Sequence, residues 1–87
     1  MTEQRLKQIF DMSSKAWKWF KSKDSVEVSE RDDYFWECVT KDIKNEVIGC
    51  KDKSLRLFYT ELLNAYAGQF QKDYVDYLET KQEKLTL

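Results

Sequence analysis

Residues 54–82 read SLRLFYTELLNAYAGQFQKDYVDYLETKQ, and this stretch decides the fold. It contains no proline, and its apolar residues recur at steps of three and four, which is the spacing of one helix face. A helix of this length extends about 40 Å. The sequence therefore predicts one long C-terminal helix. Its apolar stripe consists of Leu55, Phe58, Tyr59, Leu62, Leu63, Tyr66, Phe70, Tyr74, Tyr77 and Leu78.

Two shorter helices, each roughly 30 Å long, are expected before it. The first covers residues 3–23, where Thr2 is placed to cap the N-terminus. The following connector, residues 22–29, alternates β-branched and polar residues and is expected to be extended or irregular. The apolar stripe of the first helix, which should face the core, consists of Leu6, Ile9, Phe10, Ser13, Ala16, Trp17 and Phe20.

The second helix is expected over residues 30–48. Ser29 followed by Asp32 resembles a capping box, and Gly49 suits the left-handed position that ends many helices. Residues 1–87 are therefore expected to form a single all-α domain, a three-helix bundle with a long C-terminal helix.

The long helix should extend past the two shorter ones. Residues 74–78 then need cover, either from the connector around Val26 and Val28 or from a second copy of the chain. Gly68 interrupts the same helix with a residue that costs roughly 1 kcal/mol relative to alanine. We expect a close helix crossing there; a kink or a seat for a partner are the alternatives.

The composition argues against catalysis and metal binding. The 87 residues include no histidine, which is the commonest general base and metal ligand. Two cysteines cannot supply four zinc ligands, and two isolated glycines make no phosphate-binding loop. We therefore predict a protein that is not an enzyme and holds no metal or cofactor. A functional thiol at Cys50, which follows the helix-ending glycine, is left open.

No apolar run approaches the ~18 residues of a membrane span, and residues 1–24 do not resemble a secretory signal. A cytoplasmic location is expected. Charge is unevenly distributed: residues 1–24 carry six basic and three acidic side chains, and residues 25–50 carry three basic and seven acidic ones. A basic first helix beside an acidic second helix is typical of a self-complementary bundle; a binding protein with two faces is the alternative.

The segment Lys15-Ala-Trp-Lys-Trp-Phe-Lys21 alternates lysines with aromatic residues. Trp17 and Phe20 fall on the core stripe, whereas Trp19 falls beside it and is a candidate anchor for a partner protein. The alternative is a nucleic-acid site formed by Lys15, Lys18 and Lys21 with an aromatic platform, or a membrane-surface helix. The net charge of −1 argues against both alternatives.

Acidic residues gather near the start of the second helix. Glu30, Asp33 and Glu37 are expected to share one helix face, and Trp36 is expected directly beside the core stripe of the same helix. The helix dipole accounts for acidic residues in the first turn but does not extend to Glu37. An acidic ridge that imitates nucleic-acid phosphates is the alternative. We treat Trp36 and this ridge as candidate contacts for a partner.

Four segments carry a resemblance to a known class of protein: Asp33-Tyr-Phe-Trp-Glu-Cys-Val39, Asp42-Ile43, Leu62-Leu63-Asn-Ala65 and Asp76-Tyr-Leu-Glu79. Together they resemble the small helical accessory proteins of phages and mobile elements of Gram-positive bacteria, over residues 33–79. That class includes inhibitors of host defence such as anti-CRISPR proteins. The resemblance implies a location in the cytoplasm of a bacterial host cell and a host protein as partner, such as a CRISPR nuclease.

The sequence therefore predicts a non-enzymatic protein-binding module that acts on a host protein by occlusion. A small nucleic-acid-binding protein is the first alternative, and a self-assembling structural protein, including a homodimer, is the second.

Overall fold

The computed structural model of the chain describes the backbone of residues 1–86 and the side chains of residues 1–82. Three α-helices and one short 3-10 helix account for most of it, and the described residues contain no strand. The helices are α1 (Glu3–Asp24), η1 (Val28–Glu30), α2 (Asp33–Gly49) and α3 (Lys53–Thr86). The prediction of an all-α, three-helix protein with a long C-terminal helix is confirmed.

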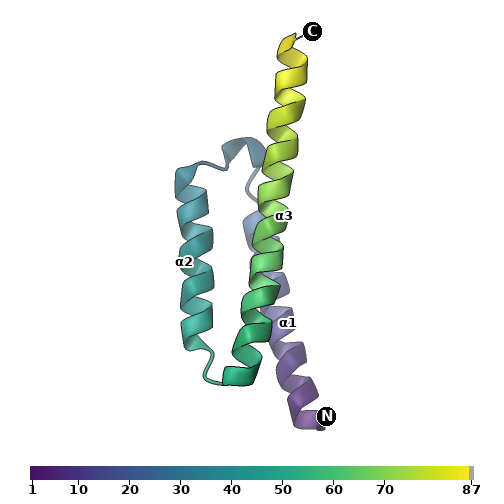
Figure 1. The fold of residues 1–87 in the computed structure, drawn as a ribbon, viewed down its shortest axis with the longest axis vertical. Coiled ribbons are helices and arrows are strands. Elements are labelled where there is room, and N and C mark those ends of the chain that lie inside the picture. Colours follow the sequence, from purple (N-terminus) through teal and green to yellow (C-terminus); the bar gives the residue numbers. More distant parts are fainter. Residues whose placement is uncertain (87) are drawn as a thin grey trace.

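Helices α1 and α3 run in the same direction and lie against each other, and α2 runs in the opposite direction beside α3 (Figure 1). The molecule is a rod with extents of 58 × 22 × 19 Å. The last turns of α3 extend beyond the other helices as a single helix (Figure 1), as the helix lengths predicted.

The start of α2 differs from the expected capping box. Ser29 lies inside η1, and the carboxylate of Asp32 caps α2 by accepting a hydrogen bond of 3.0 Å from the backbone N–H of Phe35. The helix therefore begins at Asp33 rather than at residue 30. Gly49 has no positive φ and is the last residue of α2, so the prediction of a left-handed ending is also wrong. The N–H of Cys50 bonds to the Val47 carbonyl and closes the helix without that conformation.

The core consists of a few large side chains. Phe70 is fully buried in the upper half of the bundle, where its ring stacks on Phe20 at 5.0 Å and meets the ring of Phe35 edge-on at 5.8 Å. Lower down, Ala16 packs against Tyr59 and Leu63. A small residue on α1 thus lets that helix approach α3 closely.

Helix α1 turns only part of the expected stripe toward the core, together with residues beside that stripe. Met12, Ala16 and Trp19 pack inward, whereas Leu6, Phe10 and Trp17 are 54%, 68% and 51% exposed. The prediction that these three belong to the core is wrong. Ala16 and Phe20 belong to the same expected stripe and do pack against the core, so the inward side of α1 is the predicted one rotated toward Met12 and Trp19.

The connector is held by Arg31. Its guanidinium donates to Asp24 and to the Val26 carbonyl, both at 3.2 Å, and lies within 5.3 Å of the ring centroids of Phe35 and Phe70. This contact fixes the chain between α1 and α2 against α3. Within the described range, no helix is both long and apolar enough to cross a membrane.

Charged pairs link the helices. Lys15 and Lys23 on α1 form ion pairs of 2.8 and 3.0 Å with Glu46 and Asp42 on α2, in agreement with the self-complementary reading of the charge pattern. These pairs are partly exposed, so each adds little stability but fixes how the two helices align.

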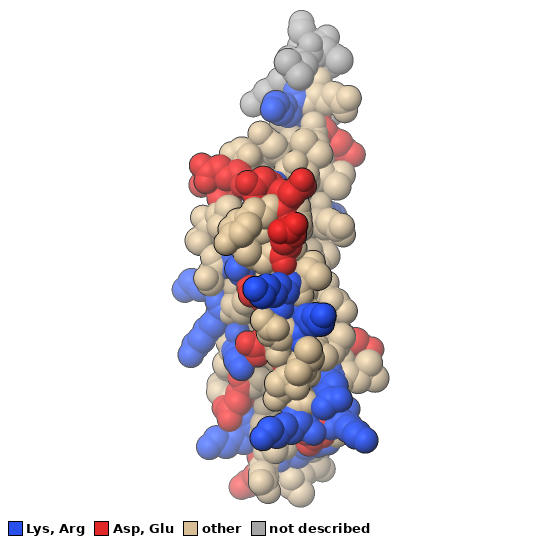
Figure 2. All heavy atoms as spheres, turned by 90° about the vertical axis from the view of Figure 1, so that its left-hand side faces the viewer, with Lys and Arg blue, Asp and Glu red and all other residues tan. Residues whose placement is uncertain are grey.

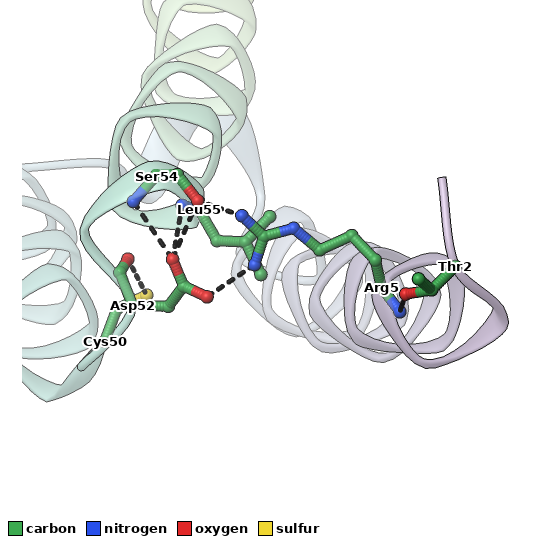
Figure 3. Close-up of polar contacts among 6 residues, drawn as sticks. All are labelled: Thr2, Arg5, Cys50, Asp52, Ser54 and Leu55. Carbon is green, nitrogen blue, oxygen red and sulfur yellow. Dashed lines mark hydrogen bonds and ion pairs between the residues drawn. The ribbon is translucent and has the colours of Figure 1, made fainter.

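At the other end of the bundle, the Asp52 carboxylate accepts hydrogen bonds from the backbone N–H groups of Ser54 and Leu55 and from the Arg5 guanidinium (Figure 3). Asp52 therefore caps α3 and joins it to α1.

Candidate protein-binding surfaces

Trp19 is a packing residue rather than a surface anchor. Its ring meets the edge of Phe70 at 6.0 Å, and its Nε1 donates a hydrogen bond of 3.0 Å to Asp42. The prediction that Trp19 lies off the core is wrong because the inward side of α1 includes Met12 and Trp19 beside Ala16. Partial burial raises the pKa of Asp42, but the hydrogen bonds from Trp19 and Lys23 outweigh it and hold that pKa below its usual value.

Trp36 is half-buried between α2 and α3. Its ring meets Phe35 at 5.0 Å and Tyr74 at 5.8 Å, both edge-on. Beside it runs a groove of ≈ 340 Å³ whose α3 wall includes Gly68. A Cβ at Gly68 would meet nothing within 4 Å, so the prediction of a close helix crossing there is wrong. The groove is lined by Trp36, Val39, Thr40, Ile43, Asn64, Ala67, Gly68 and Gln71.

The acidic residues lie together but not on one helix. Glu30 belongs to η1, whereas Asp33 opens α2 and Glu37 follows one turn later. All three are exposed. Figure 2 shows acidic side chains gathered over the upper end of this side of the molecule and basic ones below them. Only Asp33 and Glu37 share a helix face, and Glu30 belongs to another element because α2 starts later than expected.

The lysines considered for nucleic acid are not assembled into one site. Lys15 pairs with Glu46 on the α2 side of α1, whereas Lys18 and Lys21 are exposed and form no ion pair in the described part of the chain. Trp19 lies inside and offers no platform between them. The predicted combination of these lysines with Trp19 is therefore not formed, and the exposed ring of this segment is that of Trp17.

A cleft of ≈ 390 Å³ opens between the lower ends of the three helices. Cys50 lines it, half-buried, with Sγ 3.6 Å from the carbonyl oxygen of Asp52. In the same cleft Tyr59 donates to Glu46, and burial followed by that carboxylate raises the pKa of Tyr59 so that it stays neutral. Among the described residues, no cluster of histidine, cysteine or acidic side chains could hold a metal.

An exposed apolar surface on α1 was missed by sequence reasoning because its residues were expected in the core. Leu6, Phe10 and Trp17 form an exposed line on α1. The ring of Trp17 stacks on Phe20 at 5.9 Å, and Phe20 meets Tyr66 of α3 at 4.7 Å. These ring contacts connect the line to a neighbouring stripe on α3.

That stripe contains Phe58, Leu62 and Tyr66, which recur every four residues and therefore share one side of α3. Phe58 is exposed, and Leu62 and Tyr66 are half-buried. We call the combined surface the α1/α3 face. It is formed by Leu6, Phe10, Trp17, Phe20, Phe58, Leu62 and Tyr66.

The outer edge of the α1/α3 face is basic. Lys7, Lys18 and Lys21 follow the apolar line of α1, where Glu3 and Asp11 also lie, so basic side chains outnumber acidic ones by three to two; all three lysines are exposed. None of them takes part in an ion pair within the described residues, in contrast to Lys15 and Lys23 on the side that faces α2.

Searches of family models, curated proteins and solved structures found no match to this chain.

Proposed function

We propose that this chain is a non-enzymatic protein-binding module whose α1/α3 face receives an amphipathic helix from a partner protein. The observation that supports the proposal most directly is the exposure of Leu6, Phe10 and Trp17 in one line. A contiguous row of large apolar side chains on a small domain marks an interaction surface more often than a random feature of the exterior. Aromatic residues of this kind also dominate binding energy at protein interfaces.

The spacing of the line favours a helix as the bound element. Leu6, Phe10, Ser13, Trp17 and Phe20 are separated by steps of four, three, four and three residues. This is the period at which one helix packs along another. A helix laid between α1 and α3 would complete a four-helix arrangement and bury the face.

The basic edge favours acidic flanks on the bound helix. Lys7, Lys18 and Lys21 would meet its acidic side chains, which steers association and fixes orientation. A membrane surface fits less well, because many apolar residues of α1 already pack inside the bundle and only the exposed line could enter a membrane. That the partner is a host protein inhibited by occlusion, with a phage or mobile element as source and a CRISPR nuclease as target, is a prediction that rests on the resemblance of residues 33–79 alone.

The test is a selection from a display library of helical peptides, followed by NMR titration of the isotope-labelled protein. We expect the selected peptides to be acidic and amphipathic and to shift the resonances of Phe10 and Trp17. Phe10→Ser should weaken binding by about tenfold or more. Because Phe10 is largely exposed, the fold of this variant should be retained, as circular dichroism will show.

Glu37→Lys on α2 is the matched control and should bind the same peptides with unchanged affinity. Lys18→Glu should weaken the binding of acidic peptides specifically. Binding that survives Phe10→Ser would contradict the proposal. The proposal would also be contradicted if no peptide is selected but RNA or anionic vesicles bind and Phe10→Ser abolishes that binding. The α1/α3 face would then be a nucleic-acid or lipid surface.

A further inference from the structure

The outer side of α2 carries a second exposed line that the proposed function does not use. It contains Tyr34, Glu37, Lys41, Lys44 and Ile48, again at steps of three and four. Tyr34 at its upper end is 73% exposed and Ile48 at its lower end is 68% exposed. The inward residues of α2 lie on another side of the helix. The line therefore has a large apolar residue at each end and charges between them.

The charges along this line change sign halfway. Asp33 and Glu37 lie in the N-terminal half of α2, and Lys41 and Lys44 in the C-terminal half. Figure 2 views the molecule from this side and shows acidic side chains over its upper part and many lysines and arginines below. None of these four residues takes part in an ion pair within the described chain; the ion pairs of α2 use Asp42 and Glu46 instead.

A shallow hollow of ≈ 460 Å³ lies at the middle of this side of α2. It is lined by Trp36, Glu37, Thr40, Lys41 and Lys44. The small Thr40 lies between larger neighbours, so the hollow has room for the long side chain of an opposing helix. The hollow lies where the charges along α2 change sign, so a helix packed here would contact both the acidic and the basic half of the line.

We propose that two copies of this chain pair through the outer side of α2, antiparallel, about a two-fold axis near Lys41. Such an axis places Tyr34 opposite Ile48 of the second copy and Glu37 opposite Lys44 of the second copy. Because the contact is made by the same patch on both chains, each of these pairs occurs twice. The two Lys41 side chains meet near the axis, where their flexible stems can turn toward Glu37 of the other copy.

A second copy fits this side of α2 better than a foreign helix of uniform charge. A basic helix would meet Lys41 and Lys44, and an acidic one would meet Asp33 and Glu37. Only a helix whose charges run in the reverse order matches both halves, and α2 itself has that order when it is turned around. The pairing extends beyond the proposed function because it leaves both α1/α3 faces uncovered, so the dimer would be bivalent.

The experiment is sedimentation equilibrium of the full chain over a wide concentration range, with charge-reversal variants. As the protein concentration increases, the wild-type mass should rise from the 10.5 kDa of one chain to twice that value. At high salt the rise should need a higher concentration, because salt screens the charge pairs. Glu37→Lys and Lys44→Glu should each remain monomeric, because like charges then face each other at both pairs. An equimolar mixture of the two variants should dimerise, because each lysine then meets a glutamate.

The mixture keeps the test independent of folding defects, since a misfolded variant could not be rescued by its complement. Lys18→Glu on α1 is the matched control and should dimerise as the wild type does. A wild-type chain that stays monomeric throughout would overturn the proposal, as would a dimer that both reversals leave unchanged. A dimer lost in Phe10→Ser would also overturn it, because self-pairing would then belong to the α1/α3 face. Peptide binding by a strict monomer would leave the proposed function standing.

Discussion

Arg31 is a charged residue placed in the most crowded part of the bundle. Its side chain is almost fully buried, with Asp24 and the Val26 carbonyl as hydrogen-bond acceptors and two phenylalanine rings alongside. The buried Nη1 has no acceptor within the described residues. The hydrogen bonds of the guanidinium are therefore incomplete, and its packing on the two rings compensates for part of the cost of burying the charge.

Arg31→Ala should lower the free energy of unfolding by about 2 kcal/mol, because it removes the ring contacts and leaves a cavity beside Phe70. Urea denaturation followed by circular dichroism measures the change. Lys21→Ala, which truncates an exposed cation on α1, is the matched control and should stay within about 0.5 kcal/mol of the wild type. An Arg31→Ala effect as small as that of the control would mean that the connector needs no such anchor.

Gly68→Ala should raise the free energy of unfolding by about 1 kcal/mol. The position is helical, its φ is not positive, and an added Cβ would lie in open space, so only the helix propensity changes. Thermal unfolding provides the measurement. Gly49→Ala, also without neighbours but at the last residue of α2, should have a smaller effect. A destabilised Gly68→Ala would show that α2 and α3 approach more closely in solution than the groove beside Trp36 implies.

The junction between α1 and α3 depends on one carboxylate, that of Asp52. Hydrogen bonds from Ser54, then from Arg5 and from the Leu55 N–H, lower the pKa of Asp52 to about 2. Folding therefore favours the ionised form of Asp52. The same carboxylate accepts hydrogen bonds from backbone N–H groups in the first turn of α3. One residue therefore links the capping of α3 to the position of the N-terminal end of α1.

This pKa gives the stability a definite pH dependence. Because the folded pKa of Asp52 lies below the unfolded value of about 3.9, its contribution is complete above that value and is lost as the pH falls toward about 2. Urea midpoints should therefore fall between these pH values. In Asp52→Asn, which keeps a capping side chain but cannot ionise, the fall should be smaller. An identical fall in both proteins would assign acid sensitivity to other carboxylates, of which Asp42 is the first candidate.

The sequence was sufficient to predict the three elements, because long proline-free stretches with a helical period leave few alternatives. It could not determine which side of the wide apolar stripe on α1 faces the core. The choice depends on Ala16 packing against Tyr59 and Leu63, a contact between residues far apart in the chain. Rotation of α1 toward Met12 placed Trp19 inward and Leu6, Phe10 and Trp17 outward. The candidate site was therefore missed for the same reason that the core was misassigned.

The ends of the elements were also beyond local rules. Asp32 and Ser29 are both good capping residues, and the buried Arg31 between them holds the chain so that only Asp32 reaches the first turn of α2. Glu30 was consequently separated from the helix that carries Asp33 and Glu37. Trp36 was expected beside the core and is found there, half-buried.

At the scale of the whole molecule, the two proposed surfaces lie on different sides of the rod. The α1/α3 face is formed by the two parallel helices, and the self-pairing line lies on the outer side of α2 (Figure 1). A dimer through α2 would therefore present two binding faces that point away from each other. Bivalent binding of this kind raises the apparent affinity for a partner that is itself repeated, without any new contact.

The first residue and the end of α3 lie at opposite ends of the 58 Å axis (Figure 1). Tension applied between them pulls α1 and α3, which run in the same direction, past each other along their length. The interface is then loaded in shear, so the contacts of Ala16 and Phe20 with α3 must give way together rather than one after another. The contact between α1 and α3 should therefore resist stretching of the rod along its axis.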